Sequence, residues 1–429
     1  MNVEKQPSNL IKPCIPTPPT LRHYKMSFID ELAPSMNVSA VLFFSVNHDH
    51  GPKFTTRLEQ SLEKTLTRFY PLTGRYVDET HTIDCNDEGV EFTHAKVNIK
   101  MQDNILDTQE NVKFVEHFLP SEIRDADPLL AVQATVFECG GVTLGVRAAH
   151  KIVDASTLCT FINEWAATNR EEINGHEFTG PPGFMINSSS LFPGRSFSPI
   201  PLQPISDDDM SSKYIRKVFK FSEAAISNIK SKAITDGNIS TRYRHLSKVQ
   251  LVSAIIWKAL IDVDHANNNP RDSILAQPVN LREKTTSLIP KHSCGNLWGF
   301  CATEAGIDET TEELAGRLTD NVKKTINNFS KVDHNTEEGQ LTVLNSFSLP
   351  NIRESTNVIV LTSWCKFPFY DADFGFGKPS WVAPGSVPVI NTSCLMDDVQ
   401  GNGVDAHILL EVKDVPCFEE ALKVNMFST

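Results

Sequence analysis

The sequence predicts an α/β protein with two sheet-containing domains. Its 429 residues exceed what one hydrophobic core usually serves. Segments with the two-residue period of strands alternate with segments of helical period. A stretch rich in proline and serine near the middle of the chain has neither period, which is typical of a connection. We therefore expect an N-terminal domain at residues 1–180, a crossover loop at 181–212 and a C-terminal domain at 213–429.

The first domain begins with an extended segment. Four prolines between Ile11 and Thr20 exclude a helix there. A stripe of apolar side chains at helical spacing then predicts a helix between Thr55 and Pro71, ended by the proline. Strands are expected near residues 41–45, 90–92, 97–101 and 130–136. Gly140 and Gly141 predict a hairpin turn into a further strand.

That further strand, at 142–150, leads to the candidate site. Apolar residues alternate with Thr143, Gly145 and Arg147, which predicts a strand with one buried face. His150 has the parity of the apolar set, so it is expected to point inward. A helical period follows, and Asp154 is well placed to cap that helix. An inward histidine at such a junction is either a hydrogen-bonded core residue or a catalytic group, and the pattern alone leaves both open.

The second domain is predicted to mix strands and helices as well. A strand near 218–221 leads into a helix that starts near Ser222. Ser247 and Gln250 form a Ser-x-x-Gln capping box before an apolar helix at 248–263. A stripe of apolar residues predicts another helix at 314–326. Further strands are expected near 274–279, 358–361 and 407–412.

Composition and short motifs exclude several classes of function. The net charge is -13 without a basic run, which argues against a nucleic-acid or anionic-membrane partner. The nine cysteines show no paired spacing, so reduced thiols in a cytosolic protein are the simplest account. A polar N-terminus and the lack of a long apolar run favour the same compartment. No Gly-x-Gly-x-x-Gly, Walker loop or metal cluster is present, so neither a metal nor a permanently bound nucleotide cofactor is implied.

Two motifs resemble those of the BAHD family of plant acyltransferases. His150 and Asp154 match its His-x-x-x-Asp motif. Residues 373–377 match its Asp-Phe-Gly-Trp-Gly motif, with Phe376 in place of the usual tryptophan. The resemblance covers essentially the whole chain and is greatest to the alkaloid acetyltransferases of the family. Further landmarks lie at residues 68–75, 83–89, 279–282, 295–296 and 363–371.

The resemblance implies a fold, a co-substrate and a catalytic base. The fold would be two chloramphenicol-acetyltransferase-like domains of similar structure in a monomer, with acyl-coenzyme A as co-substrate. Acyl transfer from a thioester to an alcohol needs a base for the hydroxyl proton, and the neutral imidazole of His150 suits this role. The resemblance places Asp154 in a structural ion pair with Arg282 and not in a catalytic triad.

Other residues are expected to support the site. Asp373, Gly375 and Gly377 are interpreted as a tight bend with the ring of Phe376 packed beneath, lacking the indole N–H of tryptophan. Ser247 and Lys248, at the start of a capped helix, are candidates for binding the phosphates of coenzyme A. An alternative interpretation makes them only a helix cap and a solvated charge.

The resulting hypothesis is a cytosolic, monomeric O-acyltransferase. It would transfer acetyl from acetyl-coenzyme A to a hydroxyl of a plant specialised metabolite such as a monoterpene indole alkaloid. One alternative keeps the fold but uses an amine acceptor, another alcohol, or a malonyl or aromatic acyl donor. A second alternative is a binding protein that has lost turnover, against which the intact His150 argues.

Overall fold

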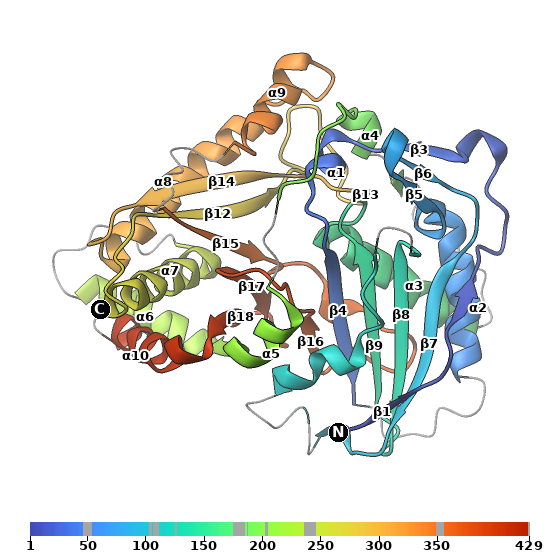
Figure 1. The fold of residues 1–429 in the computed structure, drawn as a ribbon, viewed down its shortest axis with the longest axis horizontal. Helices are drawn as coiled ribbons and strands as arrows, with labels where there is room; N and C mark the ends of the chain where they lie inside the picture. Colours follow the sequence, from blue (N-terminus) through green and yellow to red (C-terminus); the bar gives the residue numbers. More distant parts are fainter. Residues whose placement is uncertain are drawn as a thin grey trace. The chain divides into compact units, whose positions relative to one another are not determined.

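The structure is a computed structural model. It describes residues 1–45, 54–102, 105, 111–124, 127–174, 185–186, 188–201, 205–235, 246–348 and 356–427. The chain divides into two compact units, each with a mixed sheet and helices (Figure 1). This arrangement agrees with the predicted α/β class. The first unit contains Met1–Leu202, Ile289–Leu297 and Phe367–Val387, and the second contains Gln203–Leu288, Trp298–Lys366 and Pro388–Thr429.

The units differ from the expected domains because the chain returns twice to the first unit after the crossover. Residues 289–297 carry β13 (Ser293–Cys294), which pairs with β10 (Met185–Ile186). Residues 367–387 carry β16 (Trp381–Pro384), an edge strand of the first large sheet. The Asp-Phe-Gly-Phe-Gly segment was expected in the C-terminal domain, but it belongs to the first unit. The predicted crossover at 181–212 lies partly outside the described residues.

The first large sheet has the order β1-β7-β8-β9-β4-β16, with β2 also paired to β7. Strands β7 and β8 run parallel, and the other pairs are antiparallel. Gly140, with φ of +83°, turns the chain between β8 and β9 as predicted. The sequence predicted two strands, at 90–92 and 97–101, whereas the structure has one strand there, β7. The bounds are β1 (Val3–Lys5), β2 (Asn9–Ile11), β4 (Asn37–Phe44), β7 (Val90–Val97), β8 (Leu130–Phe137) and β9 (Val142–Ala149).

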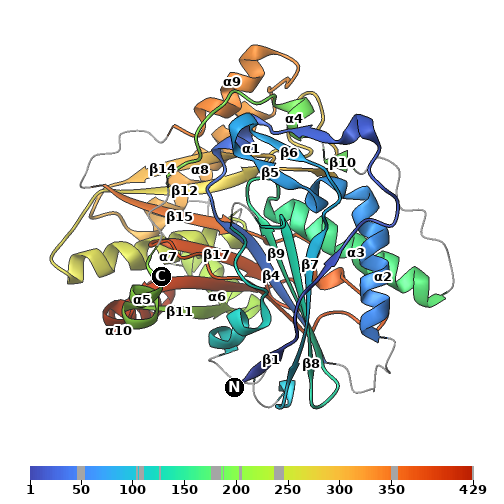
Figure 2. The same cartoon turned by 45° about the vertical axis from the view of Figure 1, so that its right-hand side comes forward.

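Helices α2 (Phe54–Arg68) and α3 (Ala155–Asn174) pack against each other beside this sheet (Figure 2). The apolar stripe predicted between Thr55 and Pro71 includes Leu58, Leu62 and Leu66, which are fully buried and fix the face that α2 presents to the core. Smaller elements of the unit are α1 (Phe28–Leu32), α4 (Ser188–Leu191), β3 (His23–Lys25), β5 (Arg75–Val77), β6 (Thr82–Asp84) and the 3₁₀ helices η1 (Pro19–Leu21), η2 (Tyr70–Thr73), η3 (Asp78–Thr80), η5 (Asn111–Phe118) and η7 (Phe369–Asp371).

Strand β9 is buried on both faces, whereas the alternating pattern predicted only one buried face. All its residues are buried. The polar face lies against the end of η5: a side chain at Gly145 would place its Cβ 1.9 Å from the Phe118 carbonyl oxygen. Arg147 on the same face is only 6% exposed and pairs with Glu116 at 3.1 Å. Close backbone approach and the ion pair of Arg147 therefore cover the face that the sequence pattern did not predict to be buried.

The second large sheet has the order β11-β18-β17-β15-β12-β14. Strand β15 is parallel to both of its neighbours, and the other pairs are antiparallel. The sequence patterns located β11, β12, β15 and β18 but missed β14 and β17. The bounds are β11 (Tyr214–Phe221), β12 (Ser273–Asn280), β14 (Trp298–Ala305), β15 (Asn357–Ser363), β17 (Thr392–Asp397) and β18 (Val404–Glu411).

Helices α6, α7, α8 and α10 share one core with this sheet. The predicted capping box of Ser247 and Gln250 is present at the start of α7, and most of that helix is buried. No helix among the described residues combines the length and the apolar character needed to cross a membrane. The helical elements of the unit are α5 (Asp207–Lys213), α6 (Glu223–Thr235), α7 (Lys248–Ala266), α8 (Thr311–Phe329), α9 (Glu337–Asn345), α10 (Val415–Phe427) and the 3₁₀ helix η8 (Val412–Asp414).

Candidate active site

His150 directly follows β9, so this strand determines the position of its Cα atom. Its backbone N–H donates to the Met36 carbonyl, 3.0 Å away, just before β4. The neighbouring strands β9 and β4 therefore both fix the backbone of the residue. His150 is partly exposed, whereas every residue of β9 before it is buried. The histidine of the motif is therefore less deeply buried than the strand before it, although its Nδ1 atom is buried.

Asp154 caps helix α3, as the sequence predicted. Its Oδ1 accepts a hydrogen bond of 2.7 Å from the backbone N–H of Thr157, the third residue of the helix. Its Oδ2 accepts one of 3.1 Å from the backbone N–H of Leu297. The carboxylate is 6% exposed and joins the helix start to the returning segment 289–297. These contacts give Asp154 a structural role.

The returning segment is held tightly against α3. The Thr157 hydroxyl donates to the Gly295 carbonyl at 2.9 Å, and the Gly295 N–H donates back to the same hydroxyl at 3.1 Å. Gly295 has φ of +105°, and a Cβ there would lie 2.2 Å from Ser188 Oγ. Only glycine fits both requirements. The fixed turn places the next residue, Asn296, within hydrogen-bond distance of the His150 backbone carbonyl.

Asn296 is a site residue that the sequence reasoning noted only as part of a family landmark. Its Nδ2 donates to the His150 carbonyl at 2.6 Å and to Asp30 Oδ1 at 2.9 Å. Its backbone N–H also donates to Asp30 Oδ1, at 3.0 Å. Asn296 lies 146 residues from His150 along the chain, so no local period could have indicated the contact.

The surroundings of His150 favour a neutral imidazole. Burial lowers the pKa of the ring below its ordinary value of 6.5 because the charged form loses solvation. Hydrogen bonding to its own backbone carbonyl, the charge of Asp154 and hydrogen bonding to Asn296 oppose this shift in part. A neutral ring near pH 7 has a lone pair on one nitrogen and can accept a proton.

Arg282 lies in the second unit, just after β12, and is 3% exposed. Its backbone N–H and its Nη1 both donate to Asn280 Oδ1, each at 3.1 Å. These contacts fix the turn that carries the guanidinium. Asp154 belongs to the first unit, and its ion pair with Arg282 stays a prediction.

The Asp-Phe-Gly-Phe-Gly segment folds around its own aspartate. Asp373 Oδ1 accepts hydrogen bonds from the backbone N–H groups of Gly375, at 2.8 Å, and Gly377, at 3.0 Å. Both glycines have positive φ, +91° and +103°, which other residues rarely adopt. The tight bend predicted from the sequence is confirmed.

The sequence interpretation placed the ring of Phe376 beneath the bend, and that ring does pack, against Phe44 and Phe54. Phe374, which the interpretation did not single out, is the more deeply buried of the two rings. Phe374 is fully buried and meets Trp165 of α3 edge-on at 4.9 Å between ring centroids. Phe376 is partly exposed, although it also meets Phe44 at 4.9 Å. Phe44 is on β4, next to β9. The segment therefore braces the strand pair that positions His150.

Ser247 and Lys248, the candidates for coenzyme A binding, are occupied within the second unit. Ser247 Oγ accepts from the Gln250 N–H at 3.1 Å as a helix cap. Lys248 Nζ donates to the carbonyls of Gly401 at 2.6 Å and Gly403 at 3.0 Å and pairs with Asp397 Oδ1 at 2.7 Å. An ammonium has three hydrogens, so a phosphate would have to replace one of these partners. Their role in coenzyme A binding stays a prediction.

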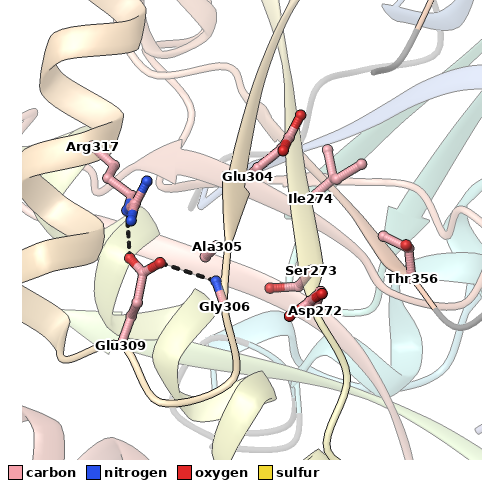
Figure 3. Close-up of a pocket in the computed structure, with 9 residues that line it drawn as sticks. All are labelled: Asp272, Ser273, Ile274, Glu304, Ala305, Gly306, Glu309, Arg317 and Thr356. Carbon is pink, nitrogen blue, oxygen red and sulfur yellow. Dashed lines mark hydrogen bonds and ion pairs between the residues drawn. The ribbon is translucent and has the colours of Figure 1, made fainter. Parts of the chain in front are cut away.

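A groove of about 410 Å³ lies beside β12 and β14 in the second unit (Figure 3). Its charged groups are mainly carboxylates, and its guanidinium, on Arg317, is paired with Glu309 at 2.6 Å. Negative charge of this kind repels the phosphates of coenzyme A, so we do not assign the groove to the acyl donor. It is lined by Asp272, Ser273, Ile274, Glu304, Ala305, Gly306, Glu309, Arg317 and Thr356.

Two mixed sheets with flanking helices define an α/β fold, and His150 lies at a strand-to-helix junction of the first unit. A family model described as "Transferase family" matches residues 1–424. Together with the motifs and the relatives below, this match shows that the chain belongs to the BAHD acyltransferases, enzymes that use acyl-coenzyme A as co-substrate.

Similar proteins cover nearly the whole chain. Vinorine synthase from Rauvolfia serpentina is 33% identical over 418 residues, covering 94% of this chain and 93% of that protein. The crystal structure of vinorine synthase matches with a TM-score of 0.81 and 31% identity, covering 100% of this chain and 98% of that one. Stemmadenine O-acetyltransferase from Catharanthus roseus is 33% identical over 414 residues, covering 93% and 92% of the two chains.

Proposed function

We propose that this protein is an O-acetyltransferase. It transfers acetyl from acetyl-coenzyme A to a hydroxyl of a plant specialised metabolite, with a monoterpene indole alkaloid as the favoured class. Family membership supports acyl-coenzyme A as the donor. Similarity to a stemmadenine O-acetyltransferase supports acetyl as the acyl group and an alcohol as the acceptor. The observation that carries the proposal is the neutral, partly exposed His150 at the end of β9.

In the proposed reaction, His150 removes the hydroxyl proton as the acceptor oxygen attacks the thioester carbonyl. This attack forms the new C–O bond and gives a tetrahedral intermediate. The intermediate then collapses, and the C–S bond breaks. The imidazolium returns its proton to the departing thiolate, so free coenzyme A leaves and the base is regenerated. A ring kept neutral before the reaction suits the first step, because a protonated imidazole has no lone pair.

The mechanism needs no covalent acyl-enzyme. Cys159 on α3 is a nearby thiol in the sequence, but it is 2% exposed. Burial raises its pKa, which suppresses the thiolate that would act as a nucleophile. The nine cysteines are all free thiols, which supports a reducing compartment such as the cytosol. We expect the enzyme to act there as a monomer.

Release of free thiol tests the proposed function. Purified protein is incubated with acetyl-coenzyme A or, separately, malonyl-coenzyme A and a panel of indole alkaloid alcohols, simple alcohols and amines, and thiol release is followed with a chromogenic reagent. We expect release that depends on both an alcohol and His150, with His150→Gln as the matched inactive control. Thiol release equal in the His150→Gln variant would refute the base. Turnover only with malonyl-coenzyme A or only with amines would refute the donor or the acceptor. Binding of both substrates without thiol release would favour an inactive homologue.

A further inference from the structure

Three aromatic side chains of the second unit form a cluster around the start of β14. Two of them, Trp298 and Phe300, are on the strand, and Phe347 follows α9. The ring centroids lie 5.1 Å apart for Trp298 and Phe300, 4.8 Å for Trp298 and Phe347, and 5.7 Å for Phe300 and Phe347. Each ring therefore contacts the other two. These three residues are called the aromatic cluster below.

The aromatic cluster lies on the face of the sheet that points away from the core shared with the helices. Trp298 and Phe300 are two residues apart on β14, so their side chains lie on the same face. In the register with β12, Phe300 is opposite Pro278. Leu275 of β12 belongs to the helix-packed core, and an odd number of residues separates it from Pro278. Phe300 therefore faces away from that core.

Part of the aromatic cluster stays exposed. Trp298 is buried, whereas Phe300 and Phe347 are both partly exposed. Aromatic rings that contact each other and still present surface are typical of binding sites, which are lined mainly by apolar and aromatic side chains. The cluster can therefore offer ring surface to a ligand.

The backbone around the cluster is positioned before any ligand binds. The Phe300 N–H donates to Ser346 Oγ at 3.1 Å, and that hydroxyl donates to the Val343 carbonyl of α9 at 2.6 Å. Gly299 permits this approach, because a Cβ there would lie 2.7 Å from Ser346 Oγ. These contacts hold Phe347, the next residue, beside the strand. A preorganised surface loses less conformational entropy when a ligand binds.

The aromatic cluster begins close along the chain to a contact with the motif histidine. Asn296 Nδ2 donates to the His150 carbonyl at 2.6 Å, and Trp298 is the second residue after Asn296. Two residues of fully extended chain span at most about 7 Å. The first ring of the cluster is therefore attached to a Cα atom within about 7 Å of the Asn296 Cα.

We propose that the aromatic cluster binds a planar aromatic ring of the acceptor. The protein then selects alcohols that carry such a ring over saturated alcohols with the same carbon skeleton. This inference rests on the proposed function for the acceptor being an alcohol, whereas binding of the ring needs no turnover. An aromatic ring has a negative face and a positive edge, so a further ring gains edge-to-face or offset contacts that a saturated ring does not make. The three residues determine specificity and take no part in proton transfer.

A matched pair of alcohols tests the selection. Naphthylethanol and its fully saturated analogue, decalinylethanol, share one carbon skeleton and differ in aromaticity. Isothermal titration calorimetry of the full chain gives Kd for each alcohol, and thiol release from acetyl-coenzyme A gives kcat/KM. Contacts of one aromatic ring with another change an equilibrium constant by a factor of about 2–10. We expect wild-type protein to bind naphthylethanol about 3–10-fold more tightly than decalinylethanol, with a similar ratio in kcat/KM.

Replacing single rings by leucine locates the site of selection. Phe300→Leu and Phe347→Leu keep an apolar side chain at partly exposed positions but remove the ring, so the preference should fall to less than about twofold. Phe219→Leu is the matched control. Phe219 is also a partly buried ring of the second unit, but it packs against the helix-covered core and meets Phe418 at 5.3 Å between centroids. We expect the control variant to keep the wild-type preference.

Four outcomes would overturn the proposal. Equal affinity of the wild type for the two alcohols does so even if neither cluster variant folds, and so does the absence of binding for both. An equal loss of preference in Phe219→Leu would show a general loosening of the unit. A preference that persists in both cluster variants, together with thiol release that depends on His150, leaves the proposed function standing without the aromatic site. If the cluster variants lose the preference in binding but no alcohol releases thiol, the aromatic site stands and the proposed function fails.

Discussion

Replacing Phe374 by alanine should destabilise the first unit far more than the same change at Phe376. Phe374 is fully buried, and its ring contacts Trp165 at 4.9 Å and Phe44 at 5.9 Å between centroids, both edge-on. Removing a buried phenylalanine ring costs about 3–5 kcal/mol of unfolding free energy, and these aromatic contacts favour the upper half of that range. Phe376 is only partly buried, so its loss should cost about 1–2 kcal/mol.

Denaturant unfolding followed by tryptophan fluorescence measures this difference, because Trp165 lies next to the deleted ring. The midpoint shift multiplied by the m-value gives the change in free energy. Phe376→Trp is the conservative partner variant and should be tolerated, since the aromatic body remains and the indole N–H can find a partner at the partly exposed position. The pH profile of the rate should be the same in all variants that fold. Equal losses for both alanine variants, or a larger loss for Phe376→Ala, would refute the assignment of Phe374 as the packed support.

Further predictions concern the base, its neighbours and the donor site. His150→Ala should leave a folded protein with acyl transfer reduced roughly 10²–10⁴-fold, and near-normal turnover in a thiol-release assay would contradict the mechanism. Burial lowers the pKa of His150 below 6.5, so the acid limb of the kcat/KM profile should lie below about pH 6.5, and an acid limb above pH 7 would contradict the lowered pKa. The free energy of unfolding should also decrease as pH falls through about 6.5, because the unfolded state then binds more protons than the folded state. Asp154→Ala and Arg282→Ala should each lower the unfolding temperature, and their effects should not add if the proposed buried ion pair exists; additive effects in a double-mutant cycle would rule out the pair. Lys248→Met should lower stability, because three contacts are lost; a rise in the KM for acetyl-coenzyme A without loss of stability would instead support the phosphate-binding role.

Local sequence patterns were sufficient to find the elements that carry the site. The alternation at 142–150, the following helical period and the cap at Asp154 correspond to β9, α3 and the observed contact to Thr157. The same patterns failed where burial comes from distant segments. Strand β9 was assigned one solvent face, yet the Phe118 carbonyl and an ion pair of Arg147 cover it. Hydrophobic periodicity shows which side chains of a segment can be buried. It does not show which distant segment packs over the polar face.

The sequence by itself therefore determined the α/β class, the family and the position of the histidine, because each depends on local spacing and on two short motifs. The partners of the histidine were decided only by tertiary structure. Asn296 reaches the His150 carbonyl, and Asp30 reaches Asn296, because Gly295 can adopt a positive φ beside Ser188 and because the chain returns to the first unit after leaving it. The buried ring of the second motif was likewise decided by contacts to Trp165 and Phe44. Hydrogen bonds and ring contacts between residues more than a hundred positions apart leave no period in the sequence, yet they hold the backbone of His150 and brace the strands that carry it.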